Sequence, residues 1–74
     1  SAMEEGVIYP NPTSGNLTVK SAVSIGDFEL LDLNGKVVLS GISHKSEMEL
    51  DISALKRGFY IFKSTYFNSK VLKD

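Results

Sequence analysis

Apolar and polar side chains alternate along much of this chain with the period of two that is typical of β-strands. The clearest case is residues 47–52, where an apolar residue follows each of three carboxylates. The pattern predicts seven short strands, at residues 7–9, 17–20, 28–33, 36–40, 47–52, 59–66 and 70–73. From the alternation we expect these apolar residues to face the core: Leu17, Val19, Met48, Leu50 and Ile52.

A hairpin is predicted where Asn34-Gly35 separates two of these strands. Asn-Gly tolerates a positive φ at both central positions of a two-residue loop, so a type I′ turn is expected. Such a turn fixes the register of the two strands. It would place Leu33 opposite Lys36 and Leu31 opposite Val38.

A second hairpin is predicted near the end of the chain, where residues 59–66 are dense in aromatic and β-branched side chains. Asn68-Ser69 would supply the turn, and residues 70–73 would return as a short last strand. Tyr60 and Phe62 share one face of the first strand. We expect the ring of Tyr60 to complete the core while its hydroxyl reaches a backbone group near the rim.

The segments between the strands are short. Gly41 to Ser46 is expected to be a loop, and residues 53–58 are too few for an independent helix. They predict a single turn that Ser53 caps and Gly58 ends. Seven short strands without a long helix predict an all-β protein, a small antiparallel β-sandwich.

Charge is unevenly distributed along the 74 residues, although the net charge is only −1. Residues 1–53 have three lysines against eight Asp and Glu, a net of −5, whereas residues 54–74 have five Lys and Arg against one Asp, a net of +4. The basic side chains of residues 54–74 either pair with side chains on neighbouring strands across a sheet or form a recognition patch. Neither the composition nor the longest apolar run indicates nucleic-acid binding or membrane insertion.

Candidate chemistry along the chain is sparse. There is no cysteine, and the single histidine, His44, lies in a predicted loop, so neither a zinc site nor a catalytic triad can be built. Asp32 begins a sequence that resembles a calcium loop, but Ser43 stands where the loop needs glutamate. Asn16 matches a glycosylation sequon that a turn asparagine explains equally well. We therefore expect no enzyme activity, no metal and no cofactor.

The order of the turns resembles a known family. Residues 9–19 read Tyr-Pro-Asn-Pro-Thr-Ser-Gly-Asn-Leu-Thr-Val, residues 30–38 read Leu-Leu-Asp-Leu-Asn-Gly-Lys-Val-Val, and residues 50–60 end in Gly-Phe-Tyr. With the closing Lys-Val-Leu-Lys, this series strongly resembles the type A C-terminal sorting domain of the bacterial type IX secretion system. The resemblance places the family motifs and the expected recognition residues on Pro10, Asn11, Pro12, Asp32, Gly35, Lys36, Gly58, Tyr60, Lys70 and Lys73.

The resemblance implies an immunoglobulin-like sandwich at residues 4–74. From their own sequence, Ser1-Ala2-Met3 are expected to be a remnant of tag removal. Its expected role is an address for an N-terminal cargo domain, which crosses the periplasm and is passed to the cell surface or the medium. Its expected partners are the outer-membrane type IX translocon and, in many members, a surface sortase that removes the domain. We expect a monomer or a weak dimer formed through a strand edge.

The last strand suggests how such an address is read. If it lies at a sheet edge, its unpaired backbone groups can bind a receptor by strand addition, and its lysines would select an acidic surface. Pro10-Asn11-Pro12 either fixes the path between two strands or is itself read by the receptor.

An immunoglobulin-like module that binds carbohydrate or protein is the alternative function. The chain has no Trp to form a planar platform for a sugar ring. The candidate aromatics for such a platform are Tyr9, Tyr66 and Phe67.

Overall fold

Seven strands form among residues 6–74, which are the residues that the computed structural model describes. They are β1 (Gly6–Tyr9), β2 (Asn16–Ser21), β3 (Gly26–Asp32), β4 (Val37–Ser43), β5 (Glu47–Asp51), β6 (Gly58–Ser64) and β7 (Asn68–Lys73). Each predicted strand is present, and its ends differ from the prediction by no more than a few residues. The predicted tag remnant, residues 1–3, lies outside the described residues.

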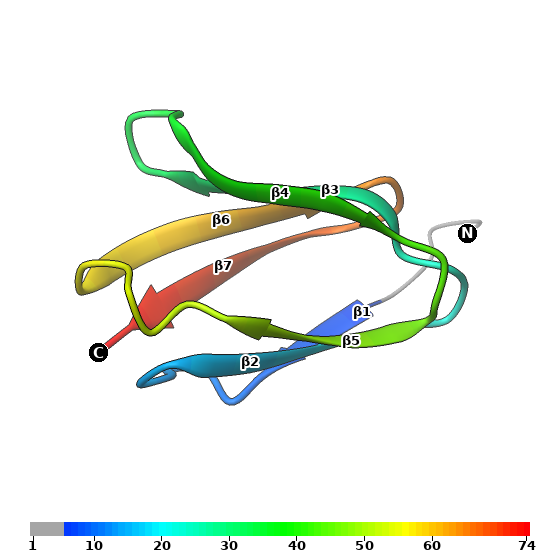
Figure 1. Cartoon of the computed structure of the whole chain (residues 1–74), viewed down its shortest axis with the longest axis horizontal. Coiled ribbons are helices and arrows are strands. Elements are labelled where there is room, and N and C mark those ends of the chain that lie inside the picture. Colours follow the sequence, from blue (N-terminus) through cyan, green and yellow to red (C-terminus); the bar gives the residue numbers. More distant parts are fainter. Residues whose placement is uncertain (1–5) are drawn as a thin grey trace.

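The strands form two antiparallel sheets that pack face to face (Figure 1). The smaller sheet has the strand order β1-β2-β5, and the larger has the order β4-β3-β6-β7. The predicted all-β, immunoglobulin-like sandwich of about seven short strands is confirmed. The strands at the sheet edges are therefore β1, β5, β4 and β7.

The core lies between the two sheets and takes one face of each strand. Its buried apolar residues are Ile8, Leu17, Val19, Ile25, Phe28, Leu30, Leu50, Ile52, Tyr60, Phe62 and Val71. The expected inward positions on β2 and β5 are confirmed, except that Met48 is only partly buried. β5 is an edge strand, so Met48 has a neighbouring strand on one side only.

The turn between β3 and β4 differs from the prediction. Asn34 does not adopt a positive φ; only Gly35 does, at 85°, so the turn is not type I′. The N–H of Gly35 donates to the carbonyl oxygen of Asp32 at 3.0 Å, and the N–H of Asp32 donates to that of Lys36 at 2.9 Å. Four residues, 33–36, separate the two strands rather than two, which leaves Leu33 in the loop and exposed.

The register of this hairpin changes with its turn. Leu31 lies opposite Val37, not Val38, and a bulge follows Leu30. The cause is the carboxylate of Asp32, whose Oδ1 accepts the N–H groups of Asn34 and Lys36, both at 2.9 Å. These two bonds stabilise the longer loop over the tighter Asn-Gly turn.

The turn between β6 and β7 is also displaced from its predicted position. It occupies residues 65–67, three residues before the predicted Asn68-Ser69 turn, and both of those residues belong to β7. The ring of Phe67 packs against that of Phe62 with centroids 5.6 Å apart, which holds Phe67 against the core. Its backbone closes the turn, because the N–H of Ser64 donates to the carbonyl oxygen of Phe67 at 3.0 Å.

β4 continues into residues that were predicted to be a loop. It runs through Gly41 to Ser43, and only His44 to Ser46 form the connection to β5. Gly41 fits in the strand because the ring of Phe28 occupies the space where a side chain would lie; an added Cβ would be 2.9 Å from that ring. His44 is exposed, as expected for a lone loop histidine.

The turn between β5 and β6 is closed by groups that the sequence did not single out. The N–H of Leu55 donates to the carbonyl oxygen of Ile52 at 3.0 Å. Ser53 does not act as the cap; instead its N–H and its hydroxyl both donate to Oδ1 of Asp51, at 2.9 and 2.6 Å. The capping acceptor is therefore the carboxylate of Asp51.

Tyr60 occupies the position that was predicted for it. Its ring is buried, and its hydroxyl donates to the carbonyl oxygen of Lys56 at 2.7 Å. The bond ties β6 to the turn that precedes it, in the manner of the tyrosine corner of immunoglobulin-like sandwiches.

Two substitutions separate the contribution of the Tyr60 ring to stability from that of its hydroxyl. Tyr60→Phe removes only the bond to Lys56 and should lower the free energy of unfolding by about 1 kcal/mol. Tyr60→Ala empties an aromatic core position and should cost about 3 to 5 kcal/mol. Urea unfolding of both variants measures the difference. Equal losses would mean that the ring contributes nothing to the core.

The Asp51 carboxyl gives a prediction in acid. Hydrogen bonds from the side chain and then the backbone of Ser53 lower its pKa below the ordinary aspartate value. Because its pKa is lowered by folding, the ionised Asp51 carboxyl stabilises the folded domain above the unfolded-state pKa. This stabilisation is lost as the pH falls through the folded-state pKa. Ser53→Ala should raise the pKa of Asp51 in an NMR titration. An unchanged pKa would mean that the hydroxyl does not act on the carboxylate.

Candidate recognition surface

Motifs that are far apart in the sequence meet at one end of the sandwich. The strand register places Asp32 opposite Tyr60, and Gly58 opposite Lys73. On its other side, Lys73 forms a parallel bridge with Thr13. Figure 1 shows the β3–β4 turn, the β5–β6 turn and the end of β7 at this same end. We call this region the motif end.

The Asp-x-x-Gly-Lys motif builds its turn rather than displaying a free carboxylate. The carboxylate of Asp32 accepts hydrogen bonds from two N–H groups of the loop, so it stabilises the turn. Gly35 takes the positive φ, with nothing within 4 Å of an added Cβ. The side chain of Lys36 is exposed beside it.

Gly58 serves the backbone in the Gly-x-Tyr motif. Its φ of 143° is one that L side chains rarely adopt, although an added Cβ would meet nothing within 4 Å. A side chain at Gly58 would therefore be strained by its backbone and not by crowding. The glycine lets the chain enter β6 so that Tyr60 turns into the core.

The segment of residues 10–13, which we call the strap, lies along the outer edge of β7. The side chain of Asn11 spans two backbone groups there: its Nδ2 donates to the carbonyl oxygen of Lys70 at 2.8 Å, and its Oδ1 accepts the N–H of Leu72 at 2.9 Å. A side-chain amide has the same donor and acceptor as a peptide group. Asn11 thus pairs with β7 as a strand residue would.

Thr13 continues the pairing with its backbone. Its N–H donates to the carbonyl oxygen of Leu72 at 2.9 Å, and its carbonyl oxygen accepts the N–H of Asp74 at 2.8 Å. Its hydroxyl is also used, since Oγ1 donates to the carbonyl oxygen of Asn16 at 2.6 Å and accepts the N–H of Gly15 at 3.1 Å. Thr13 is 2% exposed, so it anchors the strap in the fold.

β7 therefore is an edge strand, as the strand-addition hypothesis requires, but its edge is not open. The expectation of free backbone groups is wrong at the carbonyl of Lys70, at both backbone groups of Leu72 and at the N–H of Asp74. The sequence predicts that Pro10-Asn11-Pro12 either fixes the path between two strands or is read by the receptor, and it does not predict the bonds of Asn11 and Thr13 to β7. Asn11 offers a local signal, because Pro10 and Pro12 have no N–H and Asn11 is the only residue of the tripeptide with hydrogen-bond donors.

The two lysines of β7 have different surroundings. Lys73 is 7% exposed, and its Nζ donates to the carbonyl oxygen of Asp74 at 3.1 Å. Lys70 is exposed, with its Nζ 4.5 Å from the centre of the Phe59 ring. Only Lys70 displays its charge at the surface of β7.

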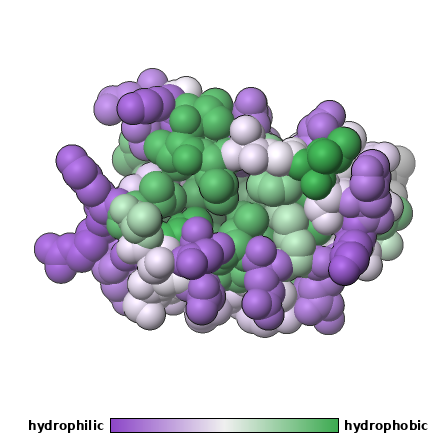
Figure 2. Space-filling view, in the orientation of Figure 1, coloured by the Kyte–Doolittle hydropathy of each residue, from purple (hydrophilic) through white to green (hydrophobic). Residues whose placement is uncertain are grey.

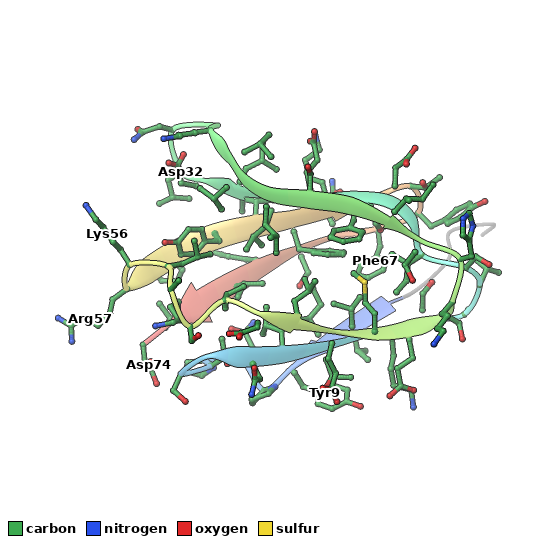
Figure 3. All side chains as sticks on the ribbon, viewed as in Figure 1. Tyr9, Asp32, Lys56, Arg57, Phe67 and Asp74 are labelled. Carbon is green, nitrogen blue, oxygen red and sulfur yellow. The ribbon has the colours of Figure 1, made fainter. Side chains whose placement is uncertain are left out.

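Other exposed cations lie near the same end. Figure 3 shows Lys56 and Arg57 projecting from the β5–β6 turn, at the end of the sandwich where Asp32 and Asp74 also lie. Lys36 is exposed on the neighbouring β3–β4 turn. The motif end therefore presents four exposed cations: Lys36, Lys56, Arg57 and Lys70.

The aromatic residues named for a carbohydrate platform do not serve as one together. Phe67 packs against the core, while Tyr9 is exposed on β1 and Tyr66 in the β6–β7 turn. Among residues 6–74 the structure contains no helix that is long and apolar enough to cross a membrane.

The fold and the motif end define a small immunoglobulin-like module whose characteristic residues lie at one end. The family model described as the secretion system C-terminal sorting domain matches residues 7–74, and the chain belongs to that family. Neither the comparison with curated proteins nor the comparison with solved structures finds a match. Membership makes the domain a sorting signal for type IX secretion, which implies contact with the secretion system, an N-terminal cargo, and export to the cell surface or the medium.

Asn11 gives a direct test of the strap. Asn11→Ala removes both of its bonds to β7 and should lower the free energy of unfolding by about 1 to 2 kcal/mol. Asn11→Asp keeps the acceptor for Leu72 but faces the Lys70 carbonyl with an oxygen, so it should cost at least as much as alanine. Urea unfolding measures both, with the exposed neighbour Ser14→Ala as a control. Variants as stable as the control would show that the strap does not hold β7.

Proposed function

We propose that the outer-membrane type IX translocon recognises this domain as a folded unit, at the motif end. The family match over residues 7–74 is the observation on which the proposal rests. Recognition of the folded state is supported by the way the motifs are built. Asp32, Gly58 and Tyr60 hold turns and core, so their contribution to recognition is to shape the surface.

The charge of the motif end indicates the chemistry of the partner. Lys36, Lys56, Arg57 and Lys70 are exposed there, which favours an acidic surface on the translocon. The ammonium group of Lys70 is positioned by its contact with the ring of Phe59. Exposed cations chiefly speed encounter and select the partner, so the effect should weaken as salt rises.

The remaining steps follow from the same proposal. The cargo enters the periplasm first, the domain at residues 4–74 directs it to the translocon, and a surface sortase then removes the domain from cargo that is to be anchored. The domain acts by binding, without catalysis, metal or cofactor, and it is a monomer before it meets the machinery. For the strap, including Pro10 and Pro12, we propose a structural role, because Asn11 and Thr13 both bind β7.

A secretion assay tests the proposed function. Residues 4–74 are fused behind a periplasmic reporter in a type IX-competent host and in the same host without the translocon. We expect the reporter at the surface or in the medium of the first host and in the periplasm of the second. A reporter that is retained in both hosts, or exported from both, would contradict the function.

The contribution of the basic surface is tested by charge reversal. Removing residues 70–74 would take Val71 out of the core and unfold the domain, so the folded variant Lys70→Glu is preferable. We expect it to lower the exported fraction several-fold at an unchanged melting temperature. Lys45→Glu, an exposed position in the loop at the other end, should be exported as the parent is. Equal export of the two variants would remove Lys70 from the recognition surface.

A further inference from the structure

The four edge strands differ in how their outer backbone groups are protected. The strap covers β7, and β1 lies in contact with β7. β5 exposes three carboxylates, Glu47, Glu49 and Asp51, and such charges discourage edge pairing. β4 has seven residues, no charged residue from Val37 to Ser43, and no part of residues 6–74 paired with its outer side. β1 also has no charged residue, but it has only four residues and lies in contact with β7.

The hydrogen bonds of the hairpin show which groups of β4 face outward. The N–H of Asp32 donates to the carbonyl oxygen of Lys36, so the backbone N–H and C=O groups of Asp32 point toward β4. Because these groups alternate along an antiparallel strand, those of every second residue before Asp32 also point toward β4. One of these residues pairs with Gly41 of β4. The N–H and C=O groups of the two neighbours of Gly41, Ser40 and Ile42, therefore point away from the sheet.

An apolar seam lies beside this edge. Its members are partly buried apolar residues that pack against the core from β4, from β5 and from the turn after β5: Val38, Leu39, Met48 and Leu55. In Figure 1 β4 and β5 run along the same side of the sandwich, and Figure 2 shows apolar surface on that side between hydrophilic rims. A strand added to β4 would cover part of this surface.

The chemistry of the seam favours a foreign strand over a second copy of β4. Antiparallel pairing of β4 with itself at the outward-facing Ser40 and Ile42 would bring Gly41 and Ser43 to the inner face, and neither is large enough to cover Leu39. Larger apolar residues at alternate positions would fill the seam. The carboxylates of β5 on the opposite rim favour basic residues in the same segment.

We propose that the outer edge of β4 binds, by strand addition, an extended segment of the secretion machinery whose alternate residues are large and apolar and whose other residues include lysine or arginine. The proposal rests on the proposed function and adds to it a second contact with the machinery, apart from the motif end. Ser40 and Ile42 supply the backbone groups, and the seam receives the apolar side chains.

Proline at position 40 tests the backbone pairing. Ser40→Pro removes an N–H that points away from β3, so the β3–β4 hydrogen bonds remain, and its ring obstructs an added strand. Ser40→Ala retains the N–H and is the matched control. In the fusion assay we expect export of Ser40→Pro to fall roughly tenfold, and export of Ser40→Ala to equal that of the parent. Parental export of Ser40→Pro, or equal losses in both variants, would overturn the proposal.

A second variant covers the case in which proline unfolds the domain. Ser40→Lys places a charge on the edge without changing the backbone, and it should lower export at a parental melting temperature. Full export of this folded variant would overturn the proposal. Failure of the proposed function would differ, because the unmodified fusion itself would then not depend on the translocon.

Sedimentation of the purified domain tests whether a second copy of the domain binds to the outer edge of β4. A monomer over the accessible concentration range supports a foreign strand. A dimer that Ser40→Pro and Ser40→Lys both abolish would show that a second copy takes the edge, and would overturn the proposed partner.

Discussion

The last strand of the sandwich is held from both sides, and the motif end depends on this double pairing. β6 binds one edge of β7, while the amide of Asn11 and the backbone of Thr13 bind the other. Because Lys73 is opposite Gly58 and bridges to Thr13, one row of residues joins segments from the two ends of the sequence. Loss of the strap would leave Val71 and Lys73, which are both buried, on a strand with only one neighbour.

The same pairing changes what an edge strand means for recognition. An open edge at β7 would invite any extended chain, including a second copy of the domain. With that edge covered, the surface of β7 contributes the charge of Lys70, and we assign strand addition to the uncharged outer edge of β4. Electrostatic selection and strand addition are therefore assigned to different parts of the molecule.

The sequence predicted those features that depend on local periodicity. Alternation placed Leu17, Val19, Leu50 and Ile52 in the core, and the position of Tyr60 in an aromatic strand predicted its buried ring and bonded hydroxyl. The β3–β4 turn could not be predicted from Asn-Gly alone, because the carboxylate of Asp32 competes for the loop N–H groups. The β6–β7 turn lies three residues before its predicted position because Phe67 packs on Phe62.

The strap lay beyond local reasoning, because Asn11 and Leu72 are 61 residues apart in the sequence. The resemblance marked Asn11 as a motif residue, but its partner appears only when β7 is in place. Amide hydrogen exchange of the free domain tests most directly the claim that the β7 edge is closed and the β4 edge is open. The account predicts slow exchange at Leu72 and Asp74 and fast exchange at Ser40 and Ile42. Fast exchange at Leu72 together with protection at Ser40 would contradict it.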